Sequence, residues 1–284
     1  MNYLHAYHAG NPADVLKHAL LVRLVRALQR KEKGFVFVDT HAGRGAYELS
    51  SIPEAGSKAR KPEWPEGIGR LWERNDAPVE VRDYLEVVRG YDRTRGNLTP
   101  APRFYPGSPR LVRLISREQD RLELWEKHPA ECAALRSAFA GERRVSFHEA
   151  DGYAAVKACL PPAERRGLVL IDPPYESQTE WQHVSAALAD AIRRFPGGTY
   201  AIWYPLTARA RVDRFLDSLK AADTPAFAAE LVLDPDSAGM KGCGVAVANP
   251  PWRFDAEAQS ILGYLGQVLA RDGVSGSVRW IAPK

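Results

Sequence analysis

A short run near the middle of the chain combines a carboxylate, two prolines and an aromatic ring at the end of an apolar segment. Residues 168–171 are Leu-Val-Leu-Ile, and Asp172, Pro173, Pro174 and Tyr175 follow them. The apolar residues predict a strand buried on both faces, and the prolines end it because proline has no backbone N–H to donate. An acid and a backbone carbonyl at a strand end can accept hydrogen bonds from an amino group, while an aromatic ring can stack on a flat base. A simple strand-end turn would use the same residues, so the other strand ends must decide between the two interpretations.

Acidic residues and glycines follow the three strands that we predict before residue 168. They are Asp39, Gly43 and Gly45 after residues 35–38, Glu126 at the end of residues 122–126, and Asp151 and Gly152 after residues 145–149. The carboxyl ends of parallel strands share one edge of a sheet, so these residues should converge on one crevice. Glycines allow the backbone to approach a ligand, and an acid after the second strand can accept from both hydroxyls of a ribose. Asp151 could accept a hydrogen bond from an adenine amino group.

The glycine loop alone does not identify the ligand. The third glycine of a dinucleotide-binding fingerprint is missing, and Glu48 stands in its place. Glu126 lies 87 residues beyond Asp39, whereas the ribose-binding acid of a Rossmann unit lies about 20 residues beyond the glycines. A nicotinamide dehydrogenase would also leave the motif at residues 172–175 without a purpose.

Strands and helices alternate along most of the chain, which predicts a largely parallel, doubly wound α/β sheet. The predicted strands are residues 35–38, 122–126, 145–149, 168–171, 200–203, 229–233, 244–248 and 277–281, and the predicted helices are residues 12–30, 111–118, 130–139, 154–158, 181–194, 209–221 and 256–269. Proline-rich residues 51–104 interrupt the pattern with helical stretches near 68–72 and 79–88. We interpret them as a small inserted helical subdomain, with residues 1–50 and 105–284 forming the main domain.

Two helix starts carry capping signals. Asn11 precedes Pro12, and Asp14 falls in the first turn, where an anion favours the helix dipole. Ser108 and Pro109 form a similar start, and Ser108 is predicted to cap that helix.

Composition excludes several classes of protein. The 284 residues are 45% hydrophobic and contain no apolar run of the roughly 20 residues that span a bilayer, nor a signal peptide, which predicts a cytoplasmic protein. The three cysteines form no Cys-x-x-Cys pair, and the histidines near the N-terminus lack partners at metal-ligand spacing, so no metal site is expected. The net charge is +4, and residues 1–33 hold six basic against two acidic residues. Such a segment suits a nucleic acid, although a solvated helix face would have the same composition.

Four motifs together resemble one family. They are Tyr3-x-x-x-Tyr7-His8-Ala9-Gly10-Asn11-Pro12-Ala13-Asp14-Val15-Leu16-Lys17-His18, Asp39-Thr40-His41-Ala42-Gly43, Tyr105-Pro106-Gly107-Ser108-Pro109 and Leu170-Ile171-Asp172-Pro173-Pro174-Tyr175-Glu176. The chain resembles the bacterial 23S ribosomal RNA adenine-N6 methyltransferases of the J family over nearly its whole length. The resemblance implies a class I S-adenosylmethionine-dependent methyltransferase, a Rossmann-like α/β fold with a small inserted helical subdomain. It also implies S-adenosylmethionine as cofactor, 23S ribosomal RNA as partner, and no membrane or metal; we expect a monomer.

The resemblance also implies roles for individual residues. The expected cofactor-binding residues, with Gly43 of the glycine loop, are His18, His41, Gly43, Ser108, Glu126, Asp151, Gly152 and Asp172. The expected RNA contacts are Tyr3 and Lys17. For catalysis we hypothesise that Asp172 and the Pro173 carbonyl accept the two amino hydrogens of adenine, with Tyr175 stacked on the flipped base.

Other functions could use the same residues 172–175. A DNA adenine-N6 methyltransferase would need a sequence-reading region, and residues 51–104 show no helix-turn-helix or zinc finger. A protein glutamine methyltransferase would leave the basic first segment without a purpose, and a non-catalytic RNA-binding protein could retain the fold alone. A near-copy of the motif, Asn249-Pro250-Pro251-Trp252, follows too many strands to be a second catalytic edge, and we interpret it as a structural strand exit.

Overall fold

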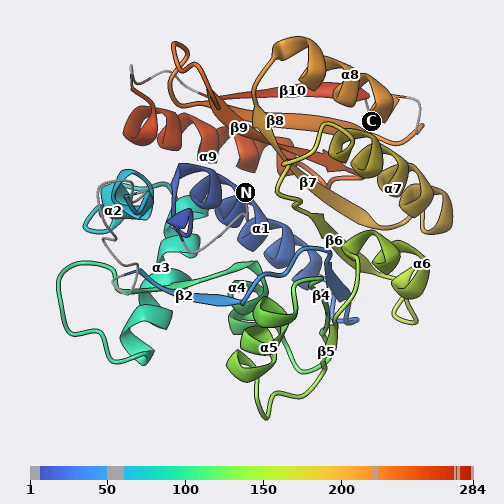
Figure 1. Ribbon diagram of the computed structural model, residues 1–284, viewed down its shortest axis with the longest axis horizontal. Helices are drawn as coiled ribbons and strands as arrows, with labels where there is room; N and C mark the ends of the chain where they lie inside the picture. Colours follow the sequence, from blue (N-terminus) through green and yellow to red (C-terminus); the bar gives the residue numbers. More distant parts are fainter. Residues whose placement is uncertain (1–6, 50–60, 221–222, 272, 274–275, 283–284) are drawn as a thin grey trace.

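Helices cover both faces of one central sheet in the computed structural model (Figure 1). The structure describes residues 7–49, 61–220, 223–271, 273 and 276–282. The strand order among them is β10-β8-β9-β7-β6-β1-β4-β5. The strands are β1 (Val36–Asp39), β4 (Arg121–Trp125), β5 (Val145–His148), β6 (Gly167–Ile171), β7 (Thr199–Leu206), β8 (Ala226–Val232), β9 (Gly242–Ala248) and β10 (Ser277–Ala282).

Neighbouring strands from β5 to β7 are parallel, whereas β9 pairs antiparallel with β7 and β8, and β10 pairs antiparallel with β8. The predicted doubly wound α/β sheet is therefore confirmed. The sequence pattern did not indicate that the strand direction reverses between β7, β9, β8 and β10. The carboxyl ends of β1, β4, β5 and β6 lie at one edge.

Apolar strands in the middle of the sheet bury both of their faces. Phe37 and Leu168 pack into one core, and their neighbours Val38 and Val169 pack into the other. Successive side chains of a strand point to opposite faces, so a strand without polar residues needs a helix layer on each side. Helices α1 (Pro12–Gln29), α3 (Val79–Thr94), α4 (Ser108–Ile115), α5 (Pro129–Ala138) and α9 (Phe254–Leu269) supply one layer, and α6 (Ala155–Cys159), α7 (Glu180–Arg194) and α8 (Arg209–Lys220) supply the other. No helix in the described part of the chain is long and apolar enough to span a membrane.

The described part of the predicted insertion packs against the main sheet's helices. It contains the 3-10 helix η3 (Trp64–Glu66), α2 (Ile68–Leu71) and α3. Tyr84 and Leu85 of α3 are fully buried in the same core as α1. The flanks of the insertion pair as a two-stranded antiparallel sheet, β2 (Ala46–Glu48) with β3 (Phe104–Pro106), which the sequence interpretation missed. Three-residue strands carry too short a pattern to be recognised.

One predicted cap is confirmed and the other is wrong. The Asn11 side chain accepts a hydrogen bond from the Asp14 backbone N–H at 2.9 Å, as expected for the start of α1. At α4 the cap is Gly107, and Ser108 is already the first helical residue. The Ser108 hydroxyl is instead directed into the molecule, where it donates to Asp39 Oδ2 at 2.7 Å.

The prediction that Asn249 belongs to a strand exit is confirmed. It follows β9, which runs antiparallel to β7, so it lies near the start of β7, away from the edge that carries Asp172. Its side-chain amide donates to the Gly198 carbonyl at 2.9 Å, and its own carbonyl accepts from the Thr199 hydroxyl at 3.0 Å.

Candidate active site

A cleft of about 750 Å³ lies at the carboxyl edge of the parallel strands. Its walls come from α1, from the loops after β1, β4 and β6, and from the end of β7. Most of the predicted site residues line it: Lys17, His18, His41, Gly43, Ser108, Glu126, Gly152, Asp172, Pro173 and Tyr175. Asp151 is exposed beside it, and Tyr3 lies outside the described residues.

A buried cation joins α1 to the end of β6. Lys17 Nζ lies 2.5 Å from Asp172 Oδ2 and 2.7 Å from Asp14 Oδ1, and its side chain is only 6% exposed. Burial opposes the charged form, but the carboxylates of Asp14 and Asp172 hold the pKa of Lys17 well above its ordinary value. Asp14 also accepts from the Gly10 backbone N–H at 3.0 Å. We predicted that Lys17 contacts RNA, whereas the structure places its ammonium on two carboxylates.

Tyr175, the aromatic residue of the motif, is held by contacts with Trp181 and Trp203. Tyr175 lines the cleft, while its hydroxyl donates to the Trp203 carbonyl at 2.8 Å. Its ring centroid lies 4.6 Å from that of Trp181 and 5.8 Å from that of Trp203. Tyr175 has a φ of 51°, an uncommon value for an aromatic residue, and such backbone strain concentrates at functional sites.

Glu126 is oriented by two backbone amides. Its Oε2 accepts from Gly43 N at 2.9 Å and its Oε1 accepts from His128 N at 2.8 Å. Gly43 has a φ of 59°, and a Cβ there would lie 2.7 Å from the Tyr47 hydroxyl oxygen. A glycine is therefore needed to bring the loop after β1 onto the acid after β4.

Ser108 owes its position to a carboxyl group beneath the cleft. Asp39 is fully buried at the end of β1 and accepts the Ser108 hydroxyl. Burial raises the pKa of Asp39 to about 7, although the hydrogen bond from Ser108 acts in the opposite direction.

The two histidines predicted to bind the cofactor line the cleft in different surroundings. Burial lowers the pKa of His41 to about 4, so its imidazole is neutral near pH 7, and its Nδ1 lies 2.8 Å from Thr40 Oγ1. His18 Nδ1 lies 2.7 Å from the Tyr105 hydroxyl, which lies 3.0 Å from the Tyr84 hydroxyl of α3. Through these three side chains the insertion reaches the wall of the cleft.

The loop after β5 touches the loop after β1. A Cβ on Gly152 would lie 1.8 Å from the Thr40 carbonyl oxygen, so only glycine fits there. Asp151 caps the following 3-10 helix η4 (Gly152–Ala154) by accepting from Tyr153 N at 2.9 Å. No group of metal-binding side chains occurs among the described residues.

The sequence interpretation missed some residues of this site. Asp14 was assigned only to the helix dipole, although its spacing of three residues from Lys17 on one helix face was a signal for a pair. Trp203 and Glu63 also line the cleft. Trp203 lies in the middle of β7 and Glu63 in the insertion, and the sequence interpretation gave neither of them a role in the site, although Trp203 belongs to a segment that also resembles the family.

Comparison with known proteins gives a consistent result. The family model described as "Ribosomal RNA large subunit methyltransferase D, RlmJ" matches residues 32–282. Proteins of Escherichia coli K12 and Haemophilus influenzae, both named "Ribosomal RNA large subunit methyltransferase J", are each 41% identical to the chain over 288 residues, covering 100% of both sequences. A crystal structure of a Legionella pneumophila protein is 34% identical, with a TM-score of 0.86 over 98% of this chain and 99% of that one.

Proposed function

Because the chain belongs to the ribosomal RNA large subunit methyltransferase J family, whose class I methyltransferase fold it shares, we propose that it methylates the N6 amino group of an adenine in 23S ribosomal RNA. S-adenosylmethionine is the methyl donor. The observation that carries the proposal is the position of Asp172, held by Lys17 at the mouth of a cleft whose other strand ends suit a nucleoside.

The strand ends fit the cofactor. Glu126 keeps acceptor capacity on both oxygens beyond its two backbone hydrogen bonds and can bind the two ribose hydroxyls. Gly43 and Gly152 let the loops after β1 and β5 pack closely against Tyr47 and Thr40 and so shape this wall of the cleft. We expect Asp151, which is exposed and precedes Gly152, to accept from the adenine amino group. When bound, the cofactor supplies a methyl group on a positively charged sulfur. His18, His41 and Ser108 provide further polar groups on the wall of the same cleft.

The residues after β6 act on the target base. An adenine amino group is a weak nucleophile because its lone pair is conjugated into the ring. Asp172 and the Pro173 carbonyl accept its two hydrogens and so direct the lone pair toward the methyl group, and Asp172 takes the proton that the nitrogen loses on methylation. Lys17 fixes Asp172 Oδ2 and leaves Oδ1 for the base. Tyr175, braced by Trp181 and Trp203, offers its accessible surface to the base.

Two measurements test the proposal. Calorimetric titration with S-adenosylmethionine should show one site on the wild type, and Glu126→Gln should weaken it about tenfold or more because it loses a charged acceptor. Transfer of a labelled methyl group to deproteinised 23S ribosomal RNA should yield N6-methyladenine. Cofactor binding without transfer to RNA would refute the proposed substrate, and absence of cofactor binding would favour a non-catalytic RNA-binding protein.

A further inference from the structure

Basic residues gather at the edge of the sheet opposite the cleft. Each of four parallel strands is preceded or begun by a pair: Lys31 and Lys33 at β1, Arg117 and Arg121 at β4, Arg143 and Arg144 at β5, and Arg165 and Arg166 at β6. The amino ends of parallel strands share one edge, so these four loops lie together. We call this set the basic edge.

A groove of about 710 Å³ lies in the basic edge, between the end of α4 and the loop that leads into β5. Three carboxylates line the groove: Asp120 binds Arg117 at 3.0 Å, Glu142 binds Arg113 at 2.6 Å, and Glu118 is exposed. Arg143 and Arg144 line the same groove, are exposed, and form no ion pair with any residue that the structure describes. Their charges are therefore available to a ligand.

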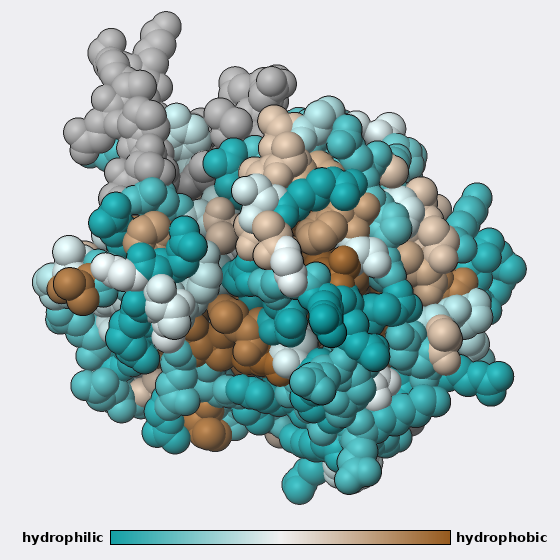
Figure 2. All heavy atoms as spheres, turned by 90° about the horizontal axis from the view of Figure 1, so that it is seen from below, coloured by the Kyte–Doolittle hydropathy of each residue, from teal (hydrophilic) through white to brown (hydrophobic). Residues whose placement is uncertain are grey.

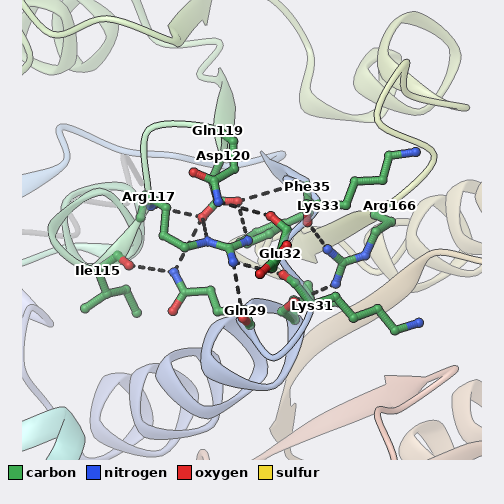
Figure 3. A network of polar contacts seen from close by, with 12 residues as sticks. Gln29, Lys31, Glu32, Lys33, Phe35, Ile115, Arg117, Gln119, Asp120 and Arg166 are labelled. Atoms are coloured by element: carbon green, nitrogen blue, oxygen red, sulfur yellow. Dashed lines mark hydrogen bonds and ion pairs between the residues drawn. The ribbon is translucent and has the colours of Figure 1, made fainter.

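The loop that carries the two lysines is clamped from both sides. Arg117 Nη1 donates to the carbonyls of Gln29 at 3.2 Å and Lys31 at 2.9 Å, and Arg166 donates to the carbonyls of Leu28 and Lys33. Figure 3 shows this network, with the side chains of Lys31 and Lys33 pointing away from it. The clamp holds two ammonium groups on the outside of the molecule beside the groove.

The arrangement matches a chain of phosphates. Exposed Lys31, Lys33, Arg143, Arg144 and Arg165 are unpaired among the described residues, and they come from separate loops along one edge. Guanidinium groups bind phosphate through two parallel hydrogen bonds, and a row of cations replaces the counterions of a nucleic acid backbone. Figure 2 views the molecule from below, and this face is largely hydrophilic at its periphery with apolar patches nearer its middle.

We propose that the basic edge binds the phosphate backbone of a second segment of the RNA, away from the segment that carries the target adenine. The partner's identity as the methylated RNA depends on the proposed function, whereas binding of RNA phosphates does not. The four strands β1, β4, β5 and β6 separate the two edges, rise about 3.3 Å per residue and contain four or five residues each, so the edges lie roughly 13–17 Å apart. The nucleotides held in the cleft therefore do not contact the basic edge themselves, and a second segment of the RNA has to supply that contact.

The binding test uses a double-stranded RNA of arbitrary sequence and the variant Arg143→Glu/Arg144→Glu. The affinity of this variant for the RNA at low salt should be about tenfold lower than that of the wild type. The slope of log affinity against log salt should become smaller by about 2, which is about 1 for each lost phosphate contact. The matched control is Arg211→Glu/Arg214→Glu, which makes the same charge change on α8. Arg143→Lys/Arg144→Lys should retain most of the slope. A slope for the Glu variant equal to that of the control would overturn the proposal.

The activity test compares intact 23S ribosomal RNA with short fragments of it. The Glu variant should show a raised KM for intact RNA, an unchanged kcat, and an unchanged KM for fragments that contain the target. An equal effect on both substrates would overturn a second contact and indicate damage at the cleft. If the wild type methylated neither substrate, the proposed function would fail while the duplex-binding result would still decide whether the basic edge binds RNA.

Discussion

Two tetrapeptides have the same pattern, a polar residue, two prolines and an aromatic residue. They lie at opposite edges of the central sheet, one where the parallel strands end and the other where they begin. Asp172-Pro173-Pro174-Tyr175 follows β6 and lines the cleft, whereas Asn249-Pro250-Pro251-Trp252 follows β9, which runs in the other direction. Both contain a residue with φ near 50°, Tyr175 in the first and Asn249 in the second. Prolines and a positive φ alone therefore do not distinguish the proposed catalytic motif from a strand exit.

The partners of the leading polar residue distinguish them. Asp172 is bound by a buried ammonium group from another element, and its carboxylate faces a cleft. The amide of Asn249 faces the segment that leads into β7, where it donates to the backbone carbonyls of Gly198 and Pro196. Both side chains are held by segments distant in sequence, but only Asp172 lines the cleft. A polar side chain satisfied by backbone away from a cavity serves the fold, and one oriented at a cavity wall can serve chemistry.

The largest expected effect separates the two motifs directly. Asp172→Ala should lower kcat for methyl transfer by about 10³-fold, within the range for loss of a general base that also orients its substrate. Binding of S-adenosylmethionine, measured by calorimetry, should change far less. Turnover near that of the wild type would remove Asp172 from the mechanism.

The second prediction concerns the cation that sets the first motif apart. Lys17→Met leaves the carboxylates of Asp14 and Asp172 buried without their cation, so the free energy of unfolding should fall by about 3 kcal/mol. Denaturant titration measures this loss. The double variant Lys17→Met/Asp14→Asn should recover part of it but none of the activity, and activity in the double variant would show that Lys17 acts only on stability.

The third prediction is that the free energy of unfolding depends on pH through Asp39, at the end of β1. The pKa of Asp39 is raised from 3.8 to about 7 by burial, so the folded state binds a proton more tightly than the unfolded chain does. Its contribution to stability is fully present below pH 4 and is lost as the pH rises toward 7, with a slope on the order of 1 kcal/mol per pH unit. Asp39→Asn should remove this slope from the unfolding free energy. An unchanged slope in the variant would assign it to other groups.

The smallest effect is expected at the second motif. Asn249→Ala loses the amide's hydrogen bonds at a positive φ, which should destabilise the protein by about 1–2 kcal/mol. Thermal unfolding should show the loss, while kcat and KM stay within about twofold of the wild-type values because the residue touches nothing in the cleft. A large fall in kcat in a variant that still folds would show that the two motifs are functionally coupled.

Residues that follow strands could be predicted from the sequence because strand, turn and acid occur together. Asp39, Glu126 and Asp172 were found in this way, and their convergence followed from the parallel sheet alone. Lys17 could not be placed, because its partner Asp172 lies 155 residues away and only the packing of α1 on the sheet brings them together.

Ser108 shows a different limit. A serine before a proline at a helix start has the pattern of a cap. The residues around Ser108 do not indicate that its hydroxyl instead donates to the buried carboxyl group of Asp39. Capping rules consider only the backbone next to the serine in sequence. A buried carboxyl group elsewhere in the fold also needs a hydrogen bond, and here it takes the hydroxyl.

We propose that Asp172 takes part in methyl transfer to an adenine of 23S ribosomal RNA and that Asn249 does not. Mass mapping of this RNA from cells that lack the gene, complemented with wild type, Asp172→Ala or Asn249→Ala, tests it most directly. One N6-methyladenine should be absent without the gene, restored by wild type and by Asn249→Ala, and still absent with equal amounts of Asp172→Ala. Restoration by Asp172→Ala, or a map that never changes, would contradict the account.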